Sequence, residues 1–157
     1  MHVPAQIATL LRSVYFGGNW TAVNLKDTLA GVDWQQATTR VHSLNTIAAL
    51  VYHIHYYIQA VSGVLRQEPL TASDKYSFDH PPIQSEEDWQ HLLNKVWTET
   101  EALTGMIEQL PESRPGEIFA NGKYGNYYRN LHGLIEHAHY HLGQIVIIKK
   151  MLPAEVM

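Results

Sequence analysis

The sequence predicts an all-α protein, a four-helix bundle with short extra helices and long loops. Three long stretches and one shorter stretch carry apolar residues at helical spacing, and no stretch alternates apolar and polar residues as a strand does. Hydrophobic residues make up 45% and charged residues 17% of the 157 residues, as in ordinary globular proteins. We therefore expect residues 1–157 to form a single domain with one core.

The N-terminal quarter holds the weaker helical patterns. Residues 5–16 have apolar side chains at helical spacing, and the pattern ends at Gly17. A short helix is predicted for residues 22–29, with Gly31 as its stop, and one further turn for residues 33–37. The helix of residues 5–16 is the fourth helix of the predicted bundle, and the elements at residues 22–29 and 33–37 are additional.

Residues 45–67 form the clearest predicted helix. Its apolar residues recur at i, i+3, i+4 and i+7 and make one stripe: Ile47, Leu50, Val51, Ile54, Ile58, Val61 and Leu65. Residues 46–65 contain no charged side chain, but two histidines, one glutamine and three tyrosines interrupt the run and no basic flank orients it. A helix buried in a bundle therefore explains the stretch better than a membrane span.

The remaining two helices are separated by irregular segments. Residues 68–84 are rich in Pro, Asp and Ser, and Ser85 then reads as an N-cap followed by acidic residues in the first turn. That helix is predicted to continue to Leu110. Residues 111–128 form a second irregular stretch, and residues 130–152 are predicted to be one long helix.

Composition excludes several classes of partner and chemistry. The net charge is −4 with neutral histidines, and the 11 Lys and Arg residues form no basic run, so we expect no nucleic-acid partner. There is no cysteine, which excludes disulfides, thiolate ligands and a cysteine nucleophile. The N-terminus lacks the features of a signal peptide, and we expect a cytoplasmic protein without membrane contact.

The last predicted helix carries a histidine pair suited to a metal ion. His137 and His141 are spaced i, i+4 and therefore lie on one helical face. Two imidazoles so placed can hold one metal if a third ligand comes from another helix. No glutamate follows His137, since Ala138 stands there, so the zincin pattern with its built-in base is absent.

The second predicted helix offers His53 or His55 as the third ligand. A helical wheel places four mostly apolar residues beside His53, namely Leu50, Tyr57, Ala60 and Val64, and three polar ones beside His55, namely Gln59, Ser62 and Arg66. His53 is therefore predicted to point into the bundle and His55 outward. His53, His137 and His141 with one open position would be a catalytic type of site. All-imidazole ligation suits zinc, nickel or iron.

Other interpretations of the polar residues stay open. The three histidines can instead be hydrogen-bonded core residues without a metal. Asn130 and Gln144 can line the pocket, hydrogen-bond a ligand histidine, or only pack between helices. A ferritin-like di-iron site is rejected, because Glu136-x-x-His139 has no second copy on another helix. No general acid or base is assigned.

The opposite face of the last helix is also apolar. His132 and His139 lie there with Ile135, Leu142, Gly143 and Val146. A bundle that stays monomeric would not need this second apolar face. We therefore expect it to be a surface for self-association, and the protein to be a homodimer.

These residues resemble the DinB-like superfamily, also called DinB/YfiT-like. The resemblance covers most of the chain and rests on His53 in Leu-Val-Tyr-His-Ile and on His137-x-x-x-His141-Leu-Gly-Gln-Ile. It implies a four-helix bundle in which His53, His137 and His141 bind one divalent metal, Zn or Ni first and Fe as a further option. It also implies a dimer and a small-molecule reaction, either S-transfer with a low-molecular-weight thiol or hydrolysis.

Two further functions remain as alternatives. The chain can be a non-catalytic bundle that binds a metal or another ligand, such as a stress-response accessory protein. It can also be an interaction module whose histidines are purely structural. Fold alone does not decide between these and an enzyme.

Overall fold

The computed structural model describes residues 2–152, and within them the protein is all-helical. The helices are α1 (Val3–Phe16), α2 (Leu25–Leu29), α3 (Trp34–Thr38), α4 (Ile47–Leu65), α5 (Glu86–Glu108) and α6 (Tyr127–Met151), with 3₁₀ turns η1 (Asp74–Tyr76) and η2 (Arg114–Gly116). The described residues form no strand, only an isolated bridge between Ile118 and Asn126. The predicted all-α class is confirmed.

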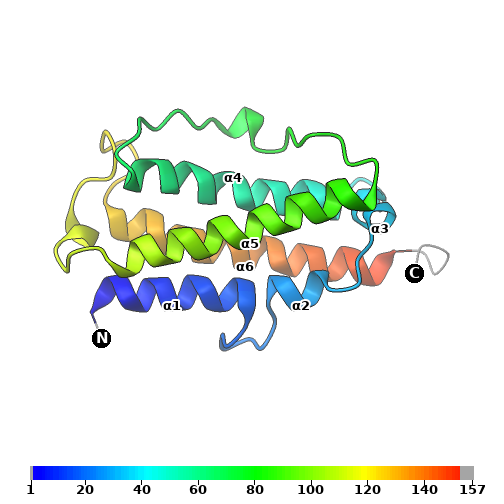
Figure 1. The fold of residues 1–157 in the computed structure, drawn as a ribbon, viewed down its shortest axis with the longest axis horizontal. Helices are drawn as coiled ribbons and strands as arrows, with labels where there is room; N and C mark the ends of the chain where they lie inside the picture. Colours follow the sequence, from blue (N-terminus) through cyan, green and yellow to red (C-terminus); the bar gives the residue numbers. More distant parts are fainter. Residues whose placement is uncertain (1, 153–157) are drawn as a thin grey trace.

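Four long helices lie side by side along the long axis of the molecule (Figure 1). α1 packs against α5 and α6, and α4 packs against the same two helices. Buried apolar side chains from all four form one continuous cluster. The stripe predicted for α4 lies in this cluster, with Leu65 at its partly buried edge.

Local capping explains where the helices begin. Ser85 caps α5 as predicted, because its hydroxyl accepts a hydrogen bond from the Asp88 N–H at 3.1 Å. α6 begins at Tyr127, earlier than the predicted Asn130, because the Asn126 side chain caps it through the Arg129 N–H at 2.9 Å. The sequence analysis missed the cap at Asn126, four residues before the predicted start.

The helix predicted for residues 22–29 is shorter in the structure. α2 begins only at Leu25, because Asn24 is its N-cap. The Asn24 side chain accepts a hydrogen bond from the Asp27 N–H at 2.9 Å. Ala22 has a positive φ of 57°, which a right-handed helix excludes. The turn predicted at residues 33–37 is α3, capped by Asp33.

Residues 66–85, hereafter the strap, connect α4 to α5 and run along the outer side of α4 (Figure 1). The Tyr56 hydroxyl donates to the Ser73 carbonyl at 3.1 Å and accepts from the Ser73 N–H at 2.8 Å. The Tyr57 hydroxyl donates to Asp74 Oδ1 at 2.6 Å. Two adjacent tyrosines of α4 therefore hold the middle of the strap in place, although the sequence predicted only an irregular connection there.

The second apolar face of α6 is largely covered within the chain. Ile135 and Leu142 are 8% and 3% exposed, and Val146 packs against the core from its edge. α6 packs against α1 as well as against α4. The apolar residues of this face therefore belong to the core of one chain, and they do not require a self-association surface.

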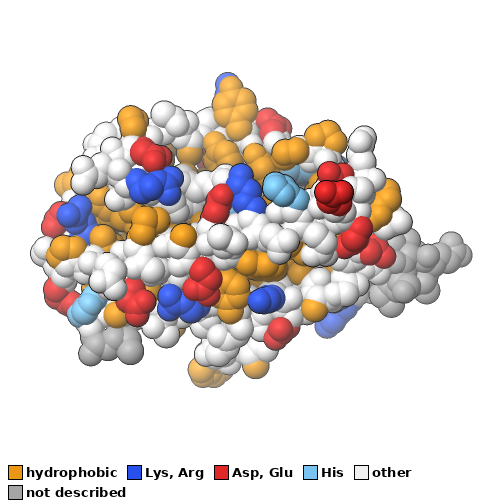
Figure 2. All heavy atoms as spheres, viewed as in Figure 1, with side chains coloured by type: hydrophobic (Ala, Val, Ile, Leu, Met, Phe, Trp, Pro, Cys, Tyr) orange, Lys and Arg blue, Asp and Glu red, His pale blue; other side chains and the backbone are white. Residues whose placement is uncertain are grey.

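The outer surface carries charges of both signs. Lys and Arg side chains are interspersed with Asp and Glu over the face shown in Figure 2, with apolar groups between them. None of the helices formed by residues 2–152 combines the length and the apolar run needed to cross a bilayer.

Trp89 joins the N-terminal segment to α5. Its ring is fully buried, and its Nε1–H donates to the Val32 carbonyl at 2.8 Å. We expect Trp89→Phe to lower the free energy of unfolding by about 2 kcal/mol, because it leaves a cavity and an unpaired carbonyl. Urea denaturation measures the change. Trp20→Phe is the matched control, because Trp20 is 100% exposed. Equal effects of the two substitutions would contradict the role given to Trp89.

Candidate metal centre

Three histidines from two helices meet at one point inside the molecule. His53 comes from α4, and His137 and His141 come from successive turns of α6, which packs against α4. His53 Nε2 lies 3.0 Å from His137 Nε2, which lies 3.1 Å from His141 Nε2. The three residues predicted from the sequence therefore lie close together and could bind a metal ion.

The outer nitrogens of two rings have hydrogen-bond partners that determine their tautomers. His141 Nδ1 lies 2.7 Å from Gln144 Oε1, a pure acceptor, so the proton is on Nδ1. His53 Nδ1 lies 3.0 Å from Ser77 Oγ, whose own proton is donated to the Asp74 carbonyl at 2.7 Å. The His53 proton is therefore also on Nδ1. We infer these positions from the hydrogen-bond network.

This tautomer pattern leaves lone pairs on Nε2 of both His53 and His141, and both face His137 Nε2. A neutral His137 has at most one proton on that atom and can satisfy only one neighbour. A cation satisfies all three nitrogens at once. Tetrahedral zinc with Zn–N bonds of 2.0–2.1 Å separates its nitrogen ligands by about 3.3 Å, close to the 3.0 and 3.1 Å between His137 Nε2 and the other two Nε2 atoms. The donor set thus fits a divalent metal.

Burial keeps these imidazoles neutral. Desolvation, followed by the proximity of the other rings, lowers the pKa of His137 to about 4. Desolvation is also the main cause that lowers the pKa of His53 and of His141, while the bond to Gln144 opposes it at His141. Neutral imidazole is the form that binds metal, so the rings need not lose protons at neutral pH to become ligands.

Aromatic rings enclose the three histidines. Phe78 of the strap stacks on His53, with ring centroids 3.9 Å apart and an angle of 6° between the planes. Tyr57 meets His137 edge-on at 4.9 Å, and Tyr140 meets His141 in the same way at 4.9 Å. These rings exclude water from much of the cluster and strengthen electrostatic interactions within it. On the side of His137, an open hollow of about 350 Å³ adjoins the cluster.

The strap supplies contacts that sequence analysis missed. Ser77 and Phe78 hold the His53 ring, yet they lie 24 and 25 positions along the chain in a segment without periodicity. No spacing rule could have found them. Of the two amide candidates, Gln144 hydrogen-bonds a histidine, whereas the Asn130 amide donates to the carbonyls of Tyr124 and Asn126.

The outward orientation predicted for His55 is wrong. His55 is 1% exposed, and its Nε2 lies 2.8 Å from Glu99 Oε2 on α5. The helical wheel failed because α5 covers the side of α4 that its polar residues suggested was wet. His132 takes no part in the cluster; it stacks on Tyr128 and lies 3.5 Å from Glu136.

Comparisons with protein families, with curated proteins and with solved structures give no match to this chain. The chemistry of the centre therefore has to be inferred from its own residues and distances.

Burial of His55 predicts a dependence of stability on pH. Desolvation is the largest cause that lowers its pKa from 6.5 to about 4, while Glu99 opposes it. Between these values the unfolded chain binds more protons at this residue than the folded chain, so its contribution to the free energy of unfolding falls as the pH falls from 6.5 to 4. We expect His55→Gln to lose less stability between pH 7 and pH 5 than the wild type, in urea denaturation of metal-free protein.

The control for this experiment is His91→Gln on the exposed side of α5. It should lose as much stability between the two pH values as the wild type does. A His55→Gln profile parallel to that of the wild type would contradict the neutral, buried state of His55.

Proposed function

We propose that this chain is a metal-dependent enzyme of the DinB-like kind, a four-helix bundle in which His53, His137 and His141 hold one divalent ion. The observation that carries the proposal is the convergence of three Nε2 atoms, two of them with lone pairs oriented by Ser77 and Gln144. Zinc or nickel is the expected ion, with iron as a further option, because imidazole ligands suit all three.

Three neutral imidazoles leave an exchangeable position, which is typical of catalytic centres and not of structural ones. A divalent ion in such a centre supplies Lewis acidity and makes a water or thiol that binds to it a better nucleophile at neutral pH. The reaction we propose is therefore transfer of a low-molecular-weight thiol to a small electrophile, or hydrolysis of a small molecule. The resemblance to DinB-like proteins supports both, and it supports a cytoplasmic homodimer.

The chain's own residues orient the centre and restrict water. Ser77 and Gln144 keep the protons of His53 and His141 on Nδ1 and so direct their Nε2 atoms inward. Tyr57 keeps its proton at neutral pH, because burial and the hydrogen bond to Asp74 raise its pKa to about 12. Its hydroxyl therefore anchors the strap and does not act as a base.

The metal content of the protein tests the centre. Elemental analysis of untagged protein purified without chelators should find about one zinc, nickel or iron per chain. His53→Ala and His137→Ala should each lose the ion, because two imidazoles remain. His132→Ala is the matched control on α6 and should retain it, since His132 lies outside the cluster. A wild type that stays metal-free after reconstitution would rule out the centre.

Gln144 gives a graded test. Gln144→Leu removes the acceptor that holds the His141 proton on Nδ1, so affinity for zinc should fall by about 10- to 100-fold while the three ligands remain. Competition with a chromophoric chelator measures the affinity. Gln90→Leu, at an exposed position of α5, should leave it unchanged. If both variants bind zinc like the wild type, Gln144 does not orient the ligand.

A further inference from the structure

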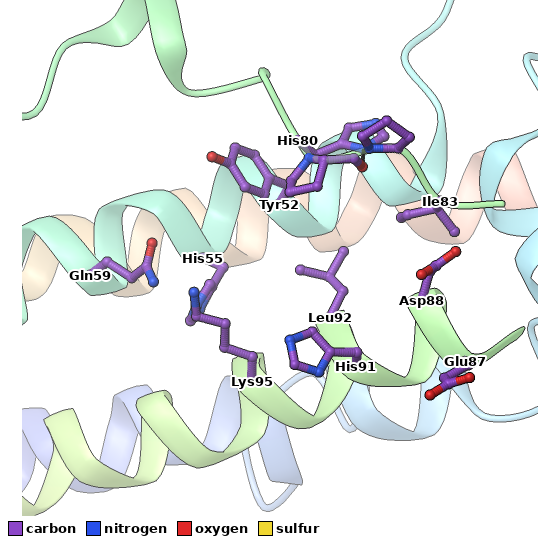
Figure 3. A pocket seen from close by; sticks show the side chains of 12 residues that line it. Tyr52, His55, Gln59, His80, Ile83, Glu87, Asp88, His91, Leu92 and Lys95 are labelled. Carbon is purple, nitrogen blue, oxygen red and sulfur yellow. Dashed lines mark hydrogen bonds between the residues drawn. The ribbon is translucent and has the colours of Figure 1, made fainter. Parts of the chain in front are cut away.

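A second pocket, hereafter the α4–α5 pocket, lies away from the three-histidine cluster. Its volume is about 400 Å³, within the range of small-molecule sites. Side chains from α4, α5 and the strap line it, and none of the three clustered histidines is among them (Figure 3). We propose that this pocket binds a short extended peptide of about three residues with free amino and carboxyl ends and an apolar middle side chain.

One end of the pocket is suited to a carboxylate. Lys95 and Gln59 lie there on facing helices, next to the buried ring of His55 (Figure 3). The carboxylate nearest to Lys95 is that of Glu99, and their 3.9 Å separation is longer than a hydrogen bond. The ammonium group thus keeps donors for a ligand, and the Gln59 amide can add another.

The other end is suited to an ammonium group. Glu87 and Asp88 lie there, in the first turn of α5 (Figure 3). Asp88 Oδ2 accepts hydrogen bonds from Gln84 N and Ser85 Oγ, both at 2.9 Å, which holds the carboxylate in place. With Glu86, three negative charges outweigh the positive half-charge of the helix N-terminus, so this end attracts a cation.

Apolar groups separate the two charged ends. Leu92 lies on the α5 side, with Ile83 of the strap and the Tyr52 ring of α4 across the pocket (Figure 3), and Pro82 is also part of the lining. The neighbouring His80 ring is held by a hydrogen bond from its Nδ1 to the Pro81 carbonyl at 2.8 Å. This middle part offers apolar contact and no charge, so it favours an apolar side chain between the ligand's two ends.

The distance between the ends sets the length of the ligand. Lys95 follows Asp88 by seven residues of one helix, so their Cα atoms lie about 10.5 Å apart along its axis. An extended tripeptide spans about 10–11 Å, while a single amino acid is too short to reach both ends. A tripeptide with free ends thus matches the charges, the apolar middle and the length together.

Calorimetric titration of the full, metal-free chain with alanyl-leucyl-alanine tests the proposal. We expect one site per chain. Acetylating the amino end, or amidating the carboxyl end, should each weaken binding by about tenfold, because each removes one charge-assisted contact. In Lys95→Met, which keeps the apolar stem, the free acid and the amide should bind equally. Lys150→Met, at an exposed position of α6, is the control and should still distinguish them.

Absence of binding at millimolar peptide, or equal binding of the free and capped peptides, would overturn the proposal. The result is independent of the metal centre, because His141→Ala removes a ligand on α6, leaves the contacts of His53 with the strap in place, and should bind the peptide like the wild type. Loss of peptide binding in that variant would contradict a separate site. Conversely, a wild type that contains metal but binds no peptide would leave the three-histidine centre intact.

Discussion

The contact between α4 and α6 is the constraint on which the rest of the molecule depends. It brings His53 within 3.0 Å of a histidine that lies 84 positions away in the chain. Polar rings are costly to bury unless their nitrogens have partners. Two of the rings find outer partners in Ser77 and Gln144, and the inner nitrogens then face one another. The packing of two helices thus brings together nitrogen lone pairs that a single cation can bind.

The strap contributes to both the three-histidine cluster and the α4–α5 pocket. Its Ser77 and Phe78 hold the His53 ring on one side of α4, and its residues 80–83 close the α4–α5 pocket on another. Tyr56 and Tyr57 of α4 hydrogen-bond to the middle of the strap, at Ser73 and Asp74. Because two residues separate Phe78 from Pro81, movement of this segment would alter both sites together. The strap therefore contributes side chains to both sites, although it has no long helix of its own.

Sequence analysis succeeded where one helix contains the whole signal. The apolar stripe of residues 45–67, the Ser85 cap and the i, i+4 pair of His137 and His141 are local features, and the structure contains all three. It failed where burial comes from a distant element. The polar neighbours of His55 suggested water on that side of α4, yet α5 covers it. On the second apolar face of α6, Ile135 and Leu142 are buried within one chain, and self-association stays a prediction.

The sequence by itself determined the helical class and the choice of three candidate ligands, because periodicity and spacing along one helix decide which side chains share a face. Only the tertiary structure decided that Ser77 and Gln144 orient two of these ligands, that Phe78 covers one, and that a second pocket lies between α4 and α5. These contacts join residues from separate elements. Their geometry depends on how helices and strap pack, which no local pattern specifies.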